Sequence, residues 1–116
     1  MSRRRILVVE DEGLVALMLE DMLEDMGYEV ACSAASVAKA LAWIEGGGEI
    51  DAALLDVNLG GELVFPVAEA LRARGVPFAF STGYGEAHDP RFRATPLLGK
   101  PILLERLQEV LKRLGV

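Results

Sequence analysis

Several features that commonly mark a protein's surroundings are missing from this sequence of 116 residues. No stretch approaches the roughly 20 consecutive apolar residues that a membrane-spanning helix needs, although 52% of the residues are hydrophobic. The opening MSRRRILVVE contains neither a long apolar segment nor the small-residue cleavage site of a signal peptide. We therefore expect a soluble protein of the cytoplasm.

Cysteine and clustered basic residues are also scarce. Cys32 is the only cysteine, which excludes an internal disulfide bond and fits a reducing compartment. The net charge is −6, and the one basic cluster is Arg3 to Arg5. Because binding to nucleic acid requires Lys and Arg side chains gathered to neutralise phosphates, we expect no nucleic-acid partner.

What the sequence does contain is an alternation of strand-like and helix-like segments, without a repeat or a linker. Short apolar runs indicate strands at 5–10, 28–34, 50–56, 76–82 and 95–101. Apolar side chains spaced three and four residues apart indicate helices at 13–26, 36–45, 66–74 and 102–114. The length fits one domain, 1–116. Such alternation predicts an α/β fold, a parallel sheet with helices on both faces.

Two helical regions carry more detailed expectations. The last helix gathers its apolar side chains on one side, namely Leu103, Leu107, Val110 and Leu114. The segment from Thr82 to Lys100 is different, because it is short and contains Gly85 and Pro90. It leaves room for only a short or irregular helix.

Polar side chains are expected to meet where the strands end, which is where function gathers in parallel α/β sheets. The residues at these ends are Glu10, Asp11, Glu12, Asp56, Ser81, Thr82 and Lys100. Crowded carboxylates repel each other, and a hard divalent cation such as Mg²⁺ relieves that repulsion. With the cation bound, Asp56 can act as a nucleophile toward a phosphoryl donor. Thr82 and Lys100 can then hold the phosphoryl oxygens.

Each of these features also has a plainer structural explanation. The acidic run 10–12 could be a solvated strand end that begins a helix, since acidic side chains favour the positive end of the helix dipole. Thr82 could serve a turn only, which is the role we assign to Gly60 and Gly61. We interpret His88 as a surface residue.

Four short motifs give the sequence a resemblance to a known family. They are VVEDE at 8–12, LLDVN at 54–58, FSTGY at 80–84 and GKP at 99–101. In this order, at the ends of four expected strands, they resemble the motifs of response-regulator receiver domains of two-component pathways. The resemblance implies a flavodoxin-like, doubly wound sheet of five parallel strands in the order 2-1-3-4-5.

The resemblance implies a metal site for Mg²⁺. By this likeness Asp11 and Asp56 are direct ligands and Glu10 acts through a water molecule. Asn58 contributes its backbone carbonyl.

The resemblance also implies phosphoryl chemistry. Asp56 accepts a phosphoryl group from a sensor histidine kinase or a histidine phosphotransfer protein, Lys100 pairs with the acyl phosphate, and Thr82 reports phosphorylation. The Lys100 to Pro101 peptide is similar to one that is often cis in this family. Such a domain catalyses only its own phosphorylation and dephosphorylation, and it signals as a monomer or weak dimer through contact with a downstream protein.

One stretch narrows the resemblance. PFAFSTGYG, residues 77–85, resembles the Pro-Phe-x-Phe-Ala-Thr-Gly-Tyr signature of mostly single-domain receivers linked to general stress responses, with Ser81 replacing alanine. Many receivers have an aromatic residue three positions before the lysine, where this chain has Leu97. We therefore expect Tyr84 to act as the mobile aromatic residue and the loop 83–93 to reorder around it. The alternative is that Tyr84 simply packs on the surface.

Two other classes of function remain open from the sequence. An aspartate-nucleophile, magnesium-dependent phosphohydrolase also uses an Asp and a Lys on a parallel sheet. Its nucleophile lies on the first strand with a second Asp two positions later, whereas here Asn58 follows Asp56. A receiver-like binding module that is never phosphorylated is the third class. The chain keeps every group that phosphorylation needs, which favours the phosphoacceptor.

Overall fold

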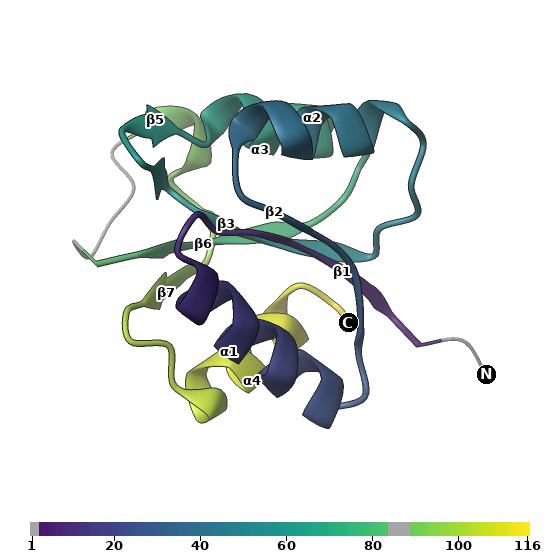
Figure 1. Cartoon of the computed structure of the whole chain (residues 1–116), viewed down its shortest axis with the longest axis vertical. Coiled ribbons are helices and arrows are strands. Elements are labelled where there is room, and N and C mark those ends of the chain that lie inside the picture. Colours follow the sequence, from purple (N-terminus) through teal and green to yellow (C-terminus); the bar gives the residue numbers. More distant parts are fainter. Residues whose placement is uncertain (1–2, 84–88) are drawn as a thin grey trace.

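The computed structural model describes residues 3–83 and 89–116, which form a five-stranded parallel sheet between two layers of helices (Figure 1). The strands are β1 Arg5–Val9, β2 Glu29–Ala34, β3 Ala52–Asp56, β6 Phe78–Thr82 and β7 Leu97–Gly99. They lie in the order β2-β1-β3-β6-β7. Counted along the sheet alone, this is the order 2-1-3-4-5 of a flavodoxin-like fold, so the predicted fold class is confirmed.

Helices cover both faces of the sheet. Helices α1 Gly13–Asp25 and α4 Leu104–Arg113 lie on one face, and α2 Val37–Glu45 and α3 Phe65–Ala73 lie on the other (Figure 1). Between Thr82 and Lys100 the sequence leaves room for only a short or irregular helix. The described residues of this segment contain a single 3₁₀ turn, η1 Pro90–Phe92. None of the helices in the described ranges is both long and apolar enough to cross a membrane.

The central strand explains why the sequence pattern is so clear around Asp56. Every residue of β3 is buried, because β1 and β6 flank it and helices cover both of its faces. A strand in this position must be apolar on both sides, and Ala52 to Leu55 meet that requirement. Asp56 is the first polar residue at its carboxyl end.

One detail of the helix prediction is wrong. Leu103 was expected on the buried side of the last helix, but it is 66% exposed. Helix α4 begins only at Leu104, and Leu103 has an extended backbone with φ −92° and ψ 139°, so its side chain does not follow the helical repeat. Leu107 and Val110 are buried as predicted, and Leu111 is the third buried residue of the helix.

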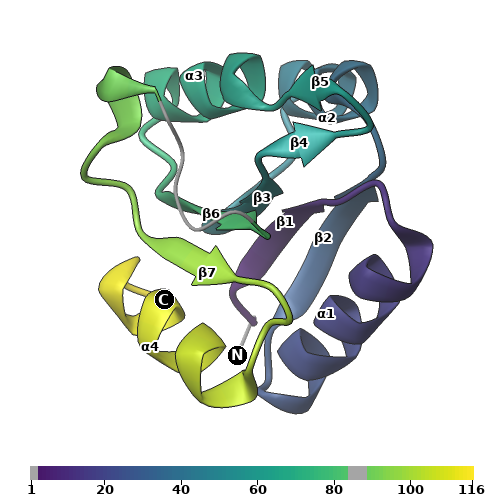
Figure 2. The same ribbon diagram turned by 90° about the vertical axis from the view of Figure 1, so that its left-hand side faces the viewer.

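A small hairpin follows β3 and stands outside the main sheet (Figure 2). Its strands are β4 Asn58–Leu59 and β5 Glu62–Leu63. The turn between them needs glycine, because Gly60 and Gly61 have φ values of 64° and 99°. The Asn58 side-chain oxygen accepts a hydrogen bond from the Gly61 N–H at 2.6 Å. The turn role assigned to these glycines is therefore confirmed.

Candidate functional site

The carboxyl ends of the strands enclose an open hollow of about 510 Å³. Its lining residues are Asp11, Glu12, Asp56, Asn58, Gly60, Gly61, Thr82, Gly83 and Lys100. These residues come from four separate parts of the chain, and the parallel sheet brings them to one edge. The sequence prediction placed Asp11, Asp56, Thr82 and Lys100 together, and the structure does the same.

Three carboxylates form the acidic side of the hollow. One oxygen each of Glu10, Asp11 and Asp56 lies within 4.8 Å of the others. Glu10 and Asp56 are only 3% and 5% exposed, whereas Asp11 is exposed. Burial raises the pKa of Asp56 to about 6, and the neighbouring Glu10 carboxyl adds to that rise, while Lys100 opposes it. The site therefore resists a further negative charge unless a cation compensates it.

Among the described residues that line the hollow, Lys100 is the one cation. Its Nζ lies 2.9 Å from Glu10 Oε1 and 3.2 Å from Asp56 Oδ2. Burial lowers the pKa of Lys100, but hydrogen bonds and charge attraction from Glu10 and Asp56 outweigh burial and raise it overall. The ammonium group therefore stays charged and forms a bridge between the two buried carboxylates. The Lys100 to Pro101 peptide is cis, as the resemblance implies.

The donor atoms suit a hard divalent cation. Glu10, Asp11 and Asp56 offer carboxylate oxygens from one cluster, which is the ligand chemistry that Mg²⁺ prefers. A single ammonium group does not balance three carboxylates. Asn58 lines the same hollow, and its side-chain oxygen is engaged in the hairpin turn. The carboxylates of this cluster therefore fit the ion.

Three residues, Thr82, Leu97 and Tyr84, were expected to respond to phosphorylation or to replace the usual response. Thr82 is buried at the end of β6, and its carbonyl accepts a hydrogen bond from the Lys100 N–H at 3.2 Å. Leu97 is half-buried in β7 beside Phe80. Tyr84 lies outside the described residues, so its predicted role is not tested.

Sequence reasoning gave no individual role to one residue of the hollow. Glu12 lines it, and its Oε1 lies 4.0 Å from Lys100 Nζ. The signal was present, because Glu12 belongs to the same acidic run as Glu10 and Asp11. Its distance to Lys100 depends on how the chain turns from β1 into α1, which spacing alone does not show.

Comparison with known proteins agrees with the fold. The model of the family described as "Response regulator receiver domain" matches residues 6–112. The chain therefore belongs to this family of two-component signalling domains. None of the curated proteins compared with the chain matches it.

Solved structures add more specific likenesses. The solution structure of SdrG from Sphingomonas melonis Fr1 is 50% identical, with a TM-score of 0.87 and 100% of each chain covered. The BeF3-activated conformation of SdrG from Pseudomonas melonis Fr1 is 48% identical, with a TM-score of 0.80 and the same coverage. The response regulator PhyR from Brucella abortus is 26% identical, with a TM-score of 0.81, over 97% of this chain and 48% of its own.

Proposed function

We propose that this receiver domain accepts a phosphoryl group on Asp56 from a phosphohistidine of a sensor histidine kinase or a histidine phosphotransfer protein. It then signals by contact with a downstream protein. The observation that carries the proposal is the setting of Asp56, whose Oδ2 lies 3.2 Å from Lys100 Nζ at the end of the buried strand β3. Glu10 and Asp11 lie beside it.

In the proposed reaction Asp56 Oδ attacks the phosphorus atom, and an acyl phosphate O–P bond forms. The P–N bond to the donor imidazole breaks, and its electron pair stays on the imidazole nitrogen. Lys100 can turn from its two carboxylate partners to the phosphoryl oxygens. Thr82, in the same hollow, can donate its hydroxyl hydrogen to one of them.

Mg²⁺ fits the proposed reaction as a resident cofactor. Asp11, Asp56 and the Asn58 backbone carbonyl would hold it directly, and Glu10 through water. When bound, the ion supplies positive charge that screens the carboxylates from the phosphoryl oxygens. The buried Glu10 keeps Lys100 in place at 2.9 Å, which orients the ammonium group toward Asp56.

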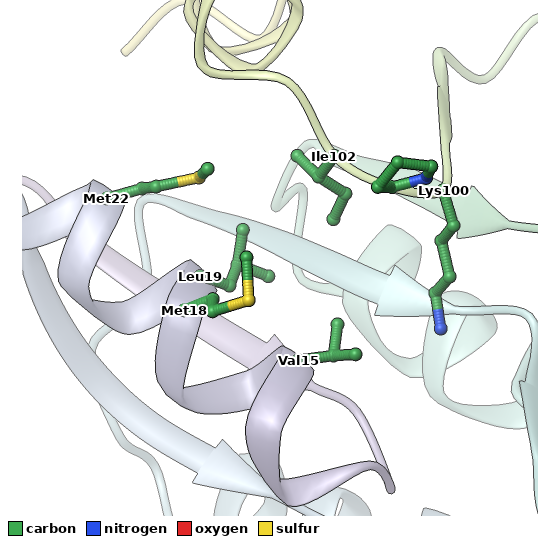
Figure 3. Close-up of a pocket in the computed structure, with 7 residues that line it drawn as sticks. Val15, Met18, Leu19, Met22, Lys100 and Ile102 are labelled. Carbon is green, nitrogen blue, oxygen red and sulfur yellow. The ribbon is translucent and has the colours of Figure 1, made fainter.

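An exposed apolar surface beside the site supports a protein donor. We define the α1 face as Leu14, Leu17 and Met18. Leu14, Leu17 and Met18 are 78%, 55% and 56% exposed. Between α1 and the start of α4 lies a hollow of about 100 Å³, lined by apolar side chains and by Lys100 (Figure 3).

Lys100 lines both this apolar hollow and the phosphoacceptor hollow. A protein that brings a phosphohistidine to Asp56 must rest on the surface next to it. The α1 face is continuous with the site and large apolar side chains are seldom exposed together without a partner. We therefore assign this face to the phosphohistidine donor, with an apolar surface of its own around the histidine.

We further propose that this receiver belongs to the subgroup linked to general stress responses. The PFAFSTGYG stretch and the 50% identity to SdrG support a receiver of the stress-response type. The single-domain organisation of 1–116, the cytoplasmic location and the monomeric or weakly dimeric state stay predictions.

Mass spectrometry after incubation with acetyl phosphate and Mg²⁺ tests the proposed function. We expect a labile phosphoryl adduct on Asp56 that Asp56→Asn abolishes, while Asp51→Asn, just before the start of the same strand, still takes up phosphate. Stoichiometric loading of another residue would contradict the assignment. Sustained turnover of many phosphoesters would favour the phosphohydrolase.

A further inference from the structure

Phe92 is buried although it belongs to the irregular segment between β6 and β7. Only 2% of it is exposed. Its ring stacks on Phe65 with centroids 5.6 Å apart and an interplanar angle of 9°. It also meets Phe80 edge to face at 5.7 Å and Phe78 at 5.8 Å. Pairs of aromatic rings in such geometries attract each other beyond their area of burial. Phe92 therefore anchors the irregular segment to the sheet and to α3.

Hydrogen bonds and ion pairs at the protein surface also hold this segment in place. Asp89 accepts a hydrogen bond from the Arg91 N–H at 2.9 Å and pairs with the Arg91 side chain. Arg91 also pairs with Glu69 of α3. From α3, Arg72 donates to the Arg91 carbonyl at 3.0 Å, and its guanidinium carbon lies 4.4 Å from the centre of the Phe92 ring. We call residues 89–93 the strap.

Two of the rings that Phe92 contacts lie close in sequence to residues of the phosphoacceptor hollow. Side chains alternate along a strand, so Phe80 and Thr82 share one face of β6. Phe65 begins α3, directly after the hairpin that carries Asn58. Leu97, which replaces the usual aromatic residue, pairs with Phe80 in register and packs against the same apolar cluster as Phe92.

We propose that Phe92 is a positioning residue that couples the state of the phosphoacceptor site to the seating of the strap. This inference rests on the proposed function. A phosphoryl group on Asp56 offers the Thr82 hydroxyl a charged acceptor, and a shift of Thr82 disturbs the packing of Phe80 below it. Because interiors are close-packed, the Phe92 ring must then move. Seating of the strap therefore favours the unphosphorylated state.

Coupling of this kind is reciprocal, so loosening the strap must favour the phosphorylated state. Beryllofluoride, an acyl phosphate mimic, is the probe, titrated with Mg²⁺ in excess. We expect Phe92→Leu, which removes the ring but keeps an apolar side chain, to bind beryllofluoride about fivefold more tightly or better. Leu111→Ala is the matched control, because it removes apolar volume from the cluster on the other face of the sheet and leaves the rings around Phe92 in place. It should change affinity by less than about twofold.

A second variant separates coupling from core stability. Arg91→Gln removes the ion pairs with Glu69 and Asp89 at the surface and leaves the aromatic rings in place. It should also tighten beryllofluoride binding. Unchanged or weaker binding in both Phe92→Leu and Arg91→Gln would overturn the inference. Failure of the unaltered protein to bind beryllofluoride would instead overturn the proposed function, so the two failures are distinguishable.

Discussion

Asp56 is a buried carboxylate that weakens the metal-free fold. Its pKa in the folded chain is about 6 against 3.8 ordinarily, because of burial and Glu10. The folded chain therefore binds the proton more tightly than the unfolded chain. Stability falls as the pH rises from 3.8 to about 6. We expect Asp56→Asn to stabilise the metal-free protein at neutral pH by up to about 3 kcal/mol.

Thermal unfolding in a chelator measures this effect. The gain should be full above a pH of about 6 and should disappear as the pH falls toward 3.8. Asp51→Asn is the control, since the Asp51 carboxylate accepts a hydrogen bond from the Arg5 N–H at 2.7 Å and its loss brings no gain. An Asp56→Asn variant no more stable than the natural chain would contradict the argument.

Glu10 and Asp11 differ in burial, and we expect them to differ in their effect on Mg²⁺. Asp11 is exposed at the hollow and is proposed as a direct ligand, whereas Glu10 is buried and paired with Lys100. Titration calorimetry should show Asp11→Ala weakening Mg²⁺ binding by about tenfold or more, and Glu10→Gln by less. Equal affinities of Asp11→Ala and the natural chain would count against the metal site.

Residues differ in how well the sequence predicts them. The acidic run and Lys100 could be predicted because each follows a short apolar strand, and parallel strands end at one edge. Phe92 could not, because a single aromatic residue beside Pro90 belongs to no helical or strand repeat. Its burial depends on Phe65 and Phe80, which lie far from it in sequence.

At the scale of elements, periodicity predicted all the strands of the main sheet and the helices to within a few residues. The error at Leu103 arose because the apolar repeat runs past the helix end, and only the backbone shows where α4 begins. The strands β4 and β5 were missed, since two-residue strands carry no periodic signal. Their glycine turn was the part that sequence chemistry could show.

Helix α1 supports a prediction about donor recognition. Leu14→Ser combined with Leu17→Ser changes only exposed side chains, so folding and labelling by acetyl phosphate should be unaffected. Transfer from the cognate phosphohistidine protein should fall by about tenfold or more, because apolar contacts at a docking surface are lost. Leu63→Ser is the control, an exposed leucine on the hairpin beside α2 and α3 (Figure 2). If the double variant accepts the phosphoryl group from the donor at the normal rate, the α1 face is not the docking surface for the donor.

At the scale of the whole molecule, stability is unevenly distributed. Strands β1 and β3 lie inside the sheet, with neighbours on both sides and helices over both faces. Two separate apolar clusters, one on each face, bury their side chains. The hairpin of β4 and β5 pairs only with itself, and the strap is held by one buried ring and surface ion pairs. The sheet is therefore the rigid body that fixes Asp56, and the hairpin and the strap open more easily.

Native-state hydrogen exchange should reveal this order. We expect the amides of β1 and β3 to exchange only through global unfolding, because breaking their hydrogen bonds exposes both clusters. The amides of 58–63 and those of Arg91 and Phe92 should exchange at least about a hundredfold faster, through local opening that leaves the sheet intact. Mild denaturant is the internal control, since it should speed exchange in β1 and β3 strongly and in the hairpin and strap only slightly. Equal protection and equal denaturant dependence in all four segments would mean that the domain opens as one unit, without separate opening of the hairpin and the strap.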